Sequence, residues 1–226
     1  ARAAFQTALE TNPDDVDAAV GLARVVGHLE RWKEWDPEKV FAAFRHELDA
    51  LTRVGADRPD HAPLYFELGN VHTLFATALG EFGADPVPEI EAAILDFTRA
   101  SSIDPSFAEA YEGRGNALQA LGFCRSQHGQ DPIPDYEAAL TAFRYAIDRN
   151  PTLAKAVHAR AMAHYNLGLY CDSRGEDPVP AYEAAVSDLT RVLEMNPSVA
   201  QACWTLGLVR RHLAGTHRDR GQATEA

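Results

Sequence analysis

The chain has 226 residues, 46% of them apolar, and a formal net charge of −12 at pH 7. This acidity disfavours nucleic acid or an anionic membrane as a partner, because both attract basic surfaces. No apolar run approaches the roughly 20 residues of a membrane span and no signal peptide is evident, so we expect a cytoplasmic protein. Three cysteines, at 124, 171 and 203, lack metal-ligand spacing, which favours reduced, buried thiols.

Five prolines recur at a fixed interval of 46 residues: Pro13, Pro59, Pro105, Pro151 and Pro197. Three of them follow similar stretches, at 93–100, 139–146 and 185–192. A constant period indicates one structural unit copied several times. Arrays of such units expose long surfaces, and most of them bind partners.

In chain order, we expect one array over 1–226. The interval predicts the second helix of a first unit at 1–13, full units at 14–59, 60–105, 106–151 and 152–197, the first helix of a sixth unit at 198–214, and a disordered tail at 215–226. The unit 14–59 is irregular, because Asp36-Pro37 comes three residues early. We expect Trp32 and Trp35 to pack over that distortion. No cap is evident at either end, which suggests a neighbouring domain in a longer protein or self-association.

The unit 106–151 shows two amphipathic helices. The first begins near Ala108 and has apolar residues spaced along one face. Gly115 lies in its middle, and the equivalent positions are all small, which predicts close contact between helices: Ala23, Gly69, Ala161 and Gly207. The second helix has a buried stripe that includes Ala139 and Phe143, and it ends before Pro151.

This pattern resembles the tetratricopeptide repeat. It has a small residue in the first helix, small and aromatic residues in the second, and a closing proline. This resemblance implies an all-α, right-handed superhelical solenoid of antiparallel helix pairs, here called helix A and helix B. The usual unit has about 34 residues, so each copy here is longer. Lengthened repeats of this kind also look like those appended to bacterial serine/threonine protein kinases, which implies a sensory or recruitment region of a signalling protein.

The additional residues carry a repeated Asp-Pro-x-Pro sequence at 85–88, 131–134 and 177–180. Asp is a good helix cap, and proline is tolerated in the first turn, so this sequence predicts the start of helix B. Helix A would then reach about 22 residues and stop near Gly129. The alternative is a 12-residue loop in each unit, which is long for a connection.

In relatives, helix A lines a concave wall where peptides or partner helices bind. Matched onto this sequence, the positions that line it are called the groove positions: Arg24, Phe66, Asn70, Thr73, Glu112, Asn116, Gln119, Lys155, His158, Met162, Tyr165, Trp204 and Leu208. The equivalent residues Asn70 and Asn116 either bond to a peptide backbone or are solvated polar residues. Glu112 and the scarcity of lysine exclude the carboxylate clamp of chaperone adaptors. The mixed composition favours a hydrophobic peptide or a partner helix.

No phosphate loop, nucleophile elbow or metal-binding helix motif is present, so we expect no enzyme, cofactor or metal. Arg114 and Arg160 lie one interval apart and could form structural hydrogen bonds or bind an anion. Two alternatives to partner binding therefore stay open. One is self-assembly through open repeat ends, and the other is an anion-binding or small-ligand-binding accessory domain.

Overall fold

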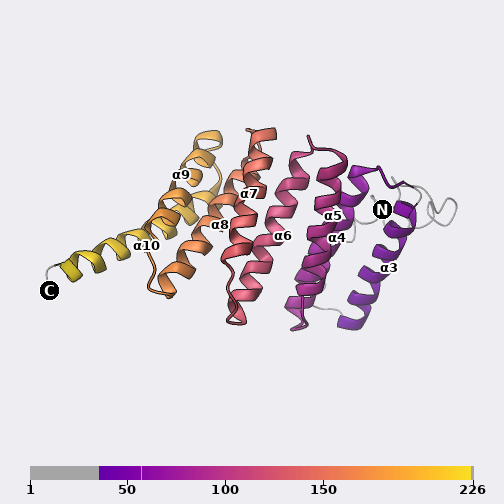
Figure 1. The fold of residues 1–226 in the computed structure, drawn as a ribbon, viewed down its shortest axis with the longest axis horizontal. Helices are drawn as coiled ribbons and strands as arrows, with labels where there is room; N and C mark the ends of the chain where they lie inside the picture. Colours follow the sequence, from indigo (N-terminus) through magenta and orange to yellow (C-terminus); the bar gives the residue numbers. More distant parts are fainter. Residues whose placement is uncertain (1–35, 57, 225–226) are drawn as a thin grey trace. The chain divides into compact units, whose positions relative to one another are not determined.

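The protein is described by a computed structural model covering residues 36–56 and 58–224, with side chains through Arg218. Within these ranges every regular element is an α-helix, as the sequence predicted (Figure 1). Arg24, Trp32, Trp35 and the helix expected at 1–13 lie outside the described residues. The elements are α3 (Pro37–Ala56), α4 (Ala62–Glu81), α5 (Val87–Ile103), α6 (Ala108–Gln127), α7 (Ile133–Arg149), α8 (Ala154–Ser173), α9 (Val179–Met195) and α10 (Ala200–Thr224).

The helices alternate between two lengths. The A helices α4, α6 and α8 each have 20 residues, slightly fewer than expected. The B helices α5, α7 and α9 each have 17 residues. Only short connections join each A helix to its B helix, at 82–86, 128–132 and 174–178. The alternative of a 12-residue loop in each unit is therefore wrong, because the additional residues lengthen both helices.

The Asp-Pro-x-Pro sequence begins helix B, as predicted. The Asp85 carboxylate accepts a hydrogen bond from the Val87 amide at 3.0 Å, and the same bond recurs at the starts of α7 and α9. Proline at these positions removes no hydrogen bond of the helix, because first-turn amides have no partner within the helix. Just before each of these starts, Gly83, Gly129 and Gly175 adopt φ values of 73°, 71° and 72°, which favour glycine.

Contacts divide the chain into two compact units, 1–117 and 118–226, with the boundary inside α6. The core of the first unit joins α3, α4 and α5, and in it the rings of Phe44 and Phe75 stack with centroids 5.2 Å apart. In the second unit, Phe143 packs with Ala139 of its own helix and Ala163 of α8. The buried stripe predicted for helix B therefore forms the core.

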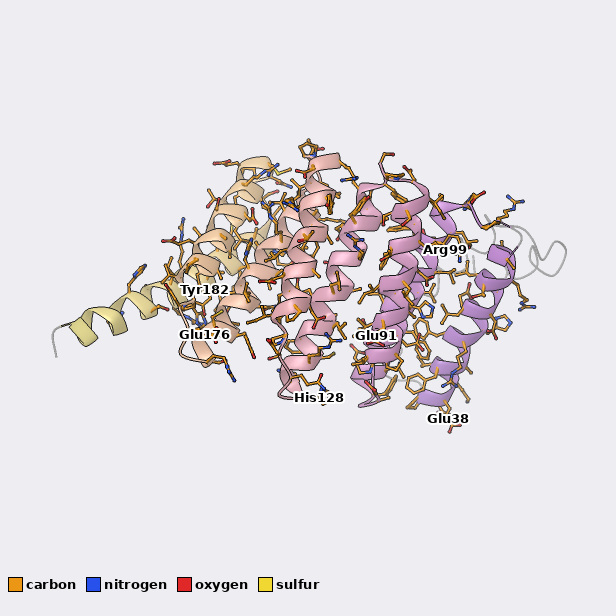
Figure 2. All side chains as sticks on the ribbon, viewed as in Figure 1. Glu38, Glu91, Arg99, His128, Glu176 and Tyr182 are labelled. Carbon is orange, nitrogen blue, oxygen red and sulfur yellow. The ribbon has the colours of Figure 1, made fainter. Side chains whose placement is uncertain are left out.

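Small residues on helix A allow an aromatic residue of helix B to approach closely. A Cβ at Gly69 would lie 2.8 Å from Phe97, and one at Gly168 would lie 2.5 Å from Tyr182. Tyr182 is fully buried on α9 (Figure 2). At Gly207 on α10, nothing lies within 4 Å of such a Cβ. The predicted close contact is confirmed at Gly69, whereas Gly207 is open.

Two expectations differ from the structure. Helix α10 does not end near Ala214 but continues to Thr224, and Figure 1 shows its last turns projecting past α9. No Asp-Pro-x-Pro sequence follows Gly215 to begin another helix, and the Thr216 hydroxyl donates to the His212 carbonyl within α10. The cysteines are free but not buried: Cys124 and Cys171 are half-buried, and Cys203 is exposed.

Candidate functional site

The groove positions of the first unit lie on α4 and on the first half of α6. Phe66 packs against two rings, with centroid distances of 5.7 Å to Phe97 and 4.9 Å to Phe107. The Thr73 hydroxyl donates to the Gly69 carbonyl of its own helix at 2.8 Å. Phe66 therefore contributes mainly to packing. The Thr73 hydroxyl is used in a hydrogen bond within its own helix.

The two equivalent asparagines share a local arrangement. The Asn70 amide nitrogen donates to Glu67 at 3.2 Å, and that of Asn116 donates to Glu112 at 2.6 Å. Asn116 is exposed, and Asn70 is half-buried. Each bond holds the amide in one orientation, and the amide oxygen takes no part in it. An ordered amide oxygen is a suitable acceptor for a backbone N–H of a partner.

In the second unit, α8 contributes both exposed and packed groove positions. Lys155 is exposed, and Met162 is half-buried. Tyr165 is 7% exposed, with its ring 6.0 Å from that of Tyr182 and 5.7 Å from that of His212. Burial raises the pKa of the Tyr165 hydroxyl. Tyr165 therefore belongs to the packing between α8, α9 and α10.

Two groove positions of this unit have buried polar atoms. Among the described residues, neither Gln119 Oε1 on α6 nor His158 Nε2 on α8 has a hydrogen-bond partner. Burial lowers the pKa of His158, which favours its neutral form at pH 7. A buried polar atom without a partner is costly, so these atoms would gain from a ligand or a water molecule.

Helix α10 carries the most exposed groove position. The Trp204 side chain is 69% exposed, although tryptophan is large and mostly apolar. Leu208 lies one turn further along and is half-buried, and Arg211 is exposed beyond it. Residues four apart lie on the same side of a helix. Trp204 and Leu208 therefore form an apolar strip that continues toward a positive charge.

Two arginine–aspartate pairs tie helix A to helix B. The Arg160 guanidinium of α8 contacts both carboxylate oxygens of Asp188 on α9, at 2.8 and 2.5 Å. Arg125 of α6 contacts both oxygens of Asp135 on α7, at 2.7 and 2.8 Å. The pair with Asp188 raises the pKa of Arg160. Arg160 thus makes a structural contact, but its bonds lie within one helix pair and not between repeats, as had been expected.

A cavity of about 300 Å³ lies in the first unit between α3, α4 and α5. On its wall, His72 Nδ1 is 2.6 Å from the Glu89 carboxylate, and His72 Nε2 is 3.5 Å from that of Asp96. Burial raises the pKa of Asp96 to about 6, although His72 and Arg99 oppose the shift. The guanidinium of Arg99 lies 4.1 Å from the ring centre of Tyr65.

Sequence reasoning missed this cavity, because its residues come from three helices and none is a groove position. A signal was nevertheless present in the sequence. Asp96 and Asp188 occupy the same place two intervals of 46 residues apart, but the counterpart of Arg160 is Leu68. Both units have the aspartate, but one has arginine and the other leucine at the matching position, which indicates that the two sites differ.

The parts of the chain that the structure describes lack two further features. There, no group of three or more His, Cys, Asp or Glu side chains is placed to hold a metal ion. Nor is any helix in those parts long and apolar enough to cross a membrane.

The chain is similar in structure to several solved proteins at low sequence identity. The thermophilic TPR protein TTC0263 of Thermus thermophilus matches with a TM-score of 0.61 and 16% identity, over 92% of this chain and 88% of that one. MamA matches with a TM-score of 0.53 and 16% identity, over 87% of this chain and 85% of that one. Human IFIT1, solved as a dimer with m7Gppp-AAAA, matches with a TM-score of 0.56 and 18% identity, over 98% of this chain and 43% of that one.

No family model matches the sequence, and no curated protein matches it. At identities of 16 to 18%, the structural matches show the fold alone. They confirm the predicted fold class, an all-α array of antiparallel helix pairs like that of tetratricopeptide-repeat proteins.

Proposed function

We propose that this chain is a non-enzymatic protein–protein interaction module. It binds a peptide or a partner helix through the groove positions on its A helices. We further propose that its lengthened repeats belong to the kind appended to bacterial serine/threonine kinases, and that it serves as the sensory or recruitment region of a larger signalling protein. The fold supports binding, because repeat arrays of this type expose long surfaces.

The exposure of Trp204 carries the proposal. Tryptophan is enriched among the few residues that dominate the affinity of protein interfaces, where it becomes buried in the complex. Here it is 69% exposed on α10, at a position that the sequence had assigned to partner binding. Leu208 extends the apolar strip, and Arg211 adds a positive charge at its end. This arrangement fits a partner segment with apolar anchors and an acidic residue.

Selection from a displayed peptide library on the purified 226-residue chain tests this function. The affinities of selected peptides would be measured by fluorescence anisotropy for the wild type, Trp204→Ala and Leu95→Ala. Leu95 is the matched control, because it is 71% exposed but lies on helix B. We expect Trp204→Ala to weaken binding by about tenfold or more and Leu95→Ala to leave it unchanged. Equal affinities for all three proteins would contradict the assignment.

The openness of Gly207 favours a second candidate, self-assembly through α10. At Gly69, the equivalent place on α4, the ring of Phe97 fills the space, whereas nothing lies within 4 Å of a Cβ at Gly207. A helix of a second copy could fill that space. Light scattering over a concentration series separates the candidates, since a concentration-independent monomer would exclude assembly.

A further inference from the structure

The cavity between α3, α4 and α5 has a filled counterpart elsewhere in the molecule. Asp96 on α5 and Asp188 on α9 are separated by two intervals of 46 residues, and so are Leu68 on α4 and Arg160 on α8. In the second unit, Arg160 makes a two-point contact with Asp188. In the first unit, Leu68 cannot make that contact. Asp96 therefore lacks the two-point arginine contact that Asp188 has, and its contact in this unit is with His72 Nε2, at 3.5 Å.

The cavity opens where the missing guanidinium would lie. Its lining includes Leu68, Asp96, His72, Arg99 and Tyr65, and its volume is about 300 Å³. The Asp96 side chain is 20% exposed, so a ligand can reach it from solvent. A volume of this size is at the small end of ligand pockets, and it suits a single side chain.

The lining presents one carboxylate, that of Asp96, together with His72 and the guanidinium of Arg99. His72 lies between this carboxylate and that of Glu89, which is not part of the lining. The described residues that α3 contributes to the lining carry no charge: Thr52, Gly55 and Ala56. Burial raises the pKa of Asp96, and His72 and Arg99 offset that shift only in part.

An aromatic surface also lines the cavity. The Arg99 guanidinium lies 4.1 Å from the ring centre of Tyr65, so this ring already carries a guanidinium of the chain itself. Guanidinium pairs with a carboxylate at two points and stacks on aromatic rings, whereas ammonium does neither as well. The site therefore favours arginine over lysine.

We propose that this cavity binds the guanidinium of an arginine side chain of a partner protein, in the place that Arg160 takes beside Asp188. The arginine forms a two-point contact with Asp96, which is the group of the lining that matches Asp188. Asp96 is not a groove position, but the inference rests on the proposed function in that it assumes a partner protein, and the cavity itself is tested with a probe that needs no such partner. The site would add a specificity contact to whatever protein this chain binds.

The test is an NMR titration of the full chain at pH 7.5 with N-acetylarginine amide as the probe. N-acetylcitrulline amide, which has the same shape without the charge, is the control ligand. We expect saturable shifts of the Leu68, His72 and Asp96 amides with the arginine probe and at least tenfold weaker binding of citrulline. Asp96→Asn should abolish the response. Glu91→Gln, the same loss of charge at an exposed site on α5, should preserve it (Figure 2).

A second variant restores the missing residue. Leu68→Arg should fill the cavity from within, raise the melting temperature and abolish binding of the probe. Circular dichroism would show whether this variant folds. If it does not, the comparison of Asp96→Asn with Glu91→Gln decides whether the probe binds at Asp96. In the wild type, binding should weaken about tenfold between pH 7 and pH 5, because Asp96 becomes protonated. Equal binding of citrulline, an unchanged response in Asp96→Asn, or the same shifts with inorganic phosphate would overturn the proposal.

Discussion

The ring of Phe97 on α5 fills the space directly over Gly69 on α4. A Cβ at Gly69 would approach three atoms of that ring to between 2.8 and 2.9 Å. The ring also lies against Gly113 on α6, where a Cβ would approach it to 2.6 Å. Glycine therefore allows one buried aromatic residue to pack against two successive A helices. This contact explains why a costly residue occurs in the middle of a helix.

Gly69→Ala should destabilise the protein, although alanine is the better helix former. Overpacking a buried contact costs about 1–3 kcal/mol, which exceeds the gain of about 1 kcal/mol in helix propensity. Gly207→Ala is the control, because nothing lies within 4 Å of its Cβ. It should stabilise α10 by up to about 1 kcal/mol. Urea unfolding midpoints measure both, and a higher midpoint for Gly69→Ala would contradict the packing.

Breaking the pair between Arg160 and Asp188 should cost about 2–4 kcal/mol, because each single change leaves a largely buried charge unpaired. The side chains are only 23% and 7% exposed. Arg160→Leu with Asp188→Ala removes both charges, and Leu68 and Ala142 show that these residues occur at the same positions in other repeats. The double variant should therefore recover part of the loss. A double-mutant cycle without coupling energy would show that the pair contributes nothing.

Asp96 should make stability depend on pH in an unusual direction. Its pKa of about 6 in the folded protein lies above the ordinary value of 3.8, so the folded state holds the proton more tightly. This group therefore stabilises the fold most below pH 4, and its contribution is lost as the pH rises through 6. Asp96→Asn should be more stable than the wild type at pH 7 by about 1–2 kcal/mol and equally stable at pH 4.

Melting temperatures of the wild type, Asp96→Asn and Glu91→Gln between pH 4 and pH 8 measure this effect. Glu91 is exposed on the same helix, so its variant should follow the wild type. A wild type and an Asp96→Asn variant that differ by a constant amount across this range would show that Asp96 titrates normally.

The carboxylate of Asp131 should stabilise the start of α7. It accepts a hydrogen bond from the Ile133 amide at 3.0 Å. Removing such a bond typically costs about 1 kcal/mol. Asp131→Ala should therefore lower the unfolding free energy by about that amount, and Asp131→Asn, which keeps an acceptor oxygen, should lower it by much less. Equal losses in the two variants would indicate that charge, and not the hydrogen bond, stabilises this helix start.

The sequence predicted the helix pairs because the signals for them are local. Asp131 and Pro132 begin one helix, and Asn150 and Pro151 end it, through bonds within two to four residues. The predicted end of α10 was wrong because no local signal of this kind is present there. Without a proline after Gly215, only contacts and helix propensity determine where the helix stops.

The candidate site was harder to predict because exposure depends on packing. The family pattern identifies which helix a groove position occupies, but it does not show that Tyr165 packs against Tyr182 while Trp204 is exposed. The cavity at Asp96 required one more step. It became evident only when two units were compared position by position and Leu68 was found in the place of Arg160.

The most direct test of the account is a map of where a selected peptide touches the protein. Backbone amide shifts would be recorded by NMR for the full chain with and without that peptide. The account predicts that the largest shifts occur on α8 and α10, around His158, Met162, Trp204 and Leu208. Shifts confined to the B helices α5, α7 and α9, with Trp204 unchanged, would contradict it.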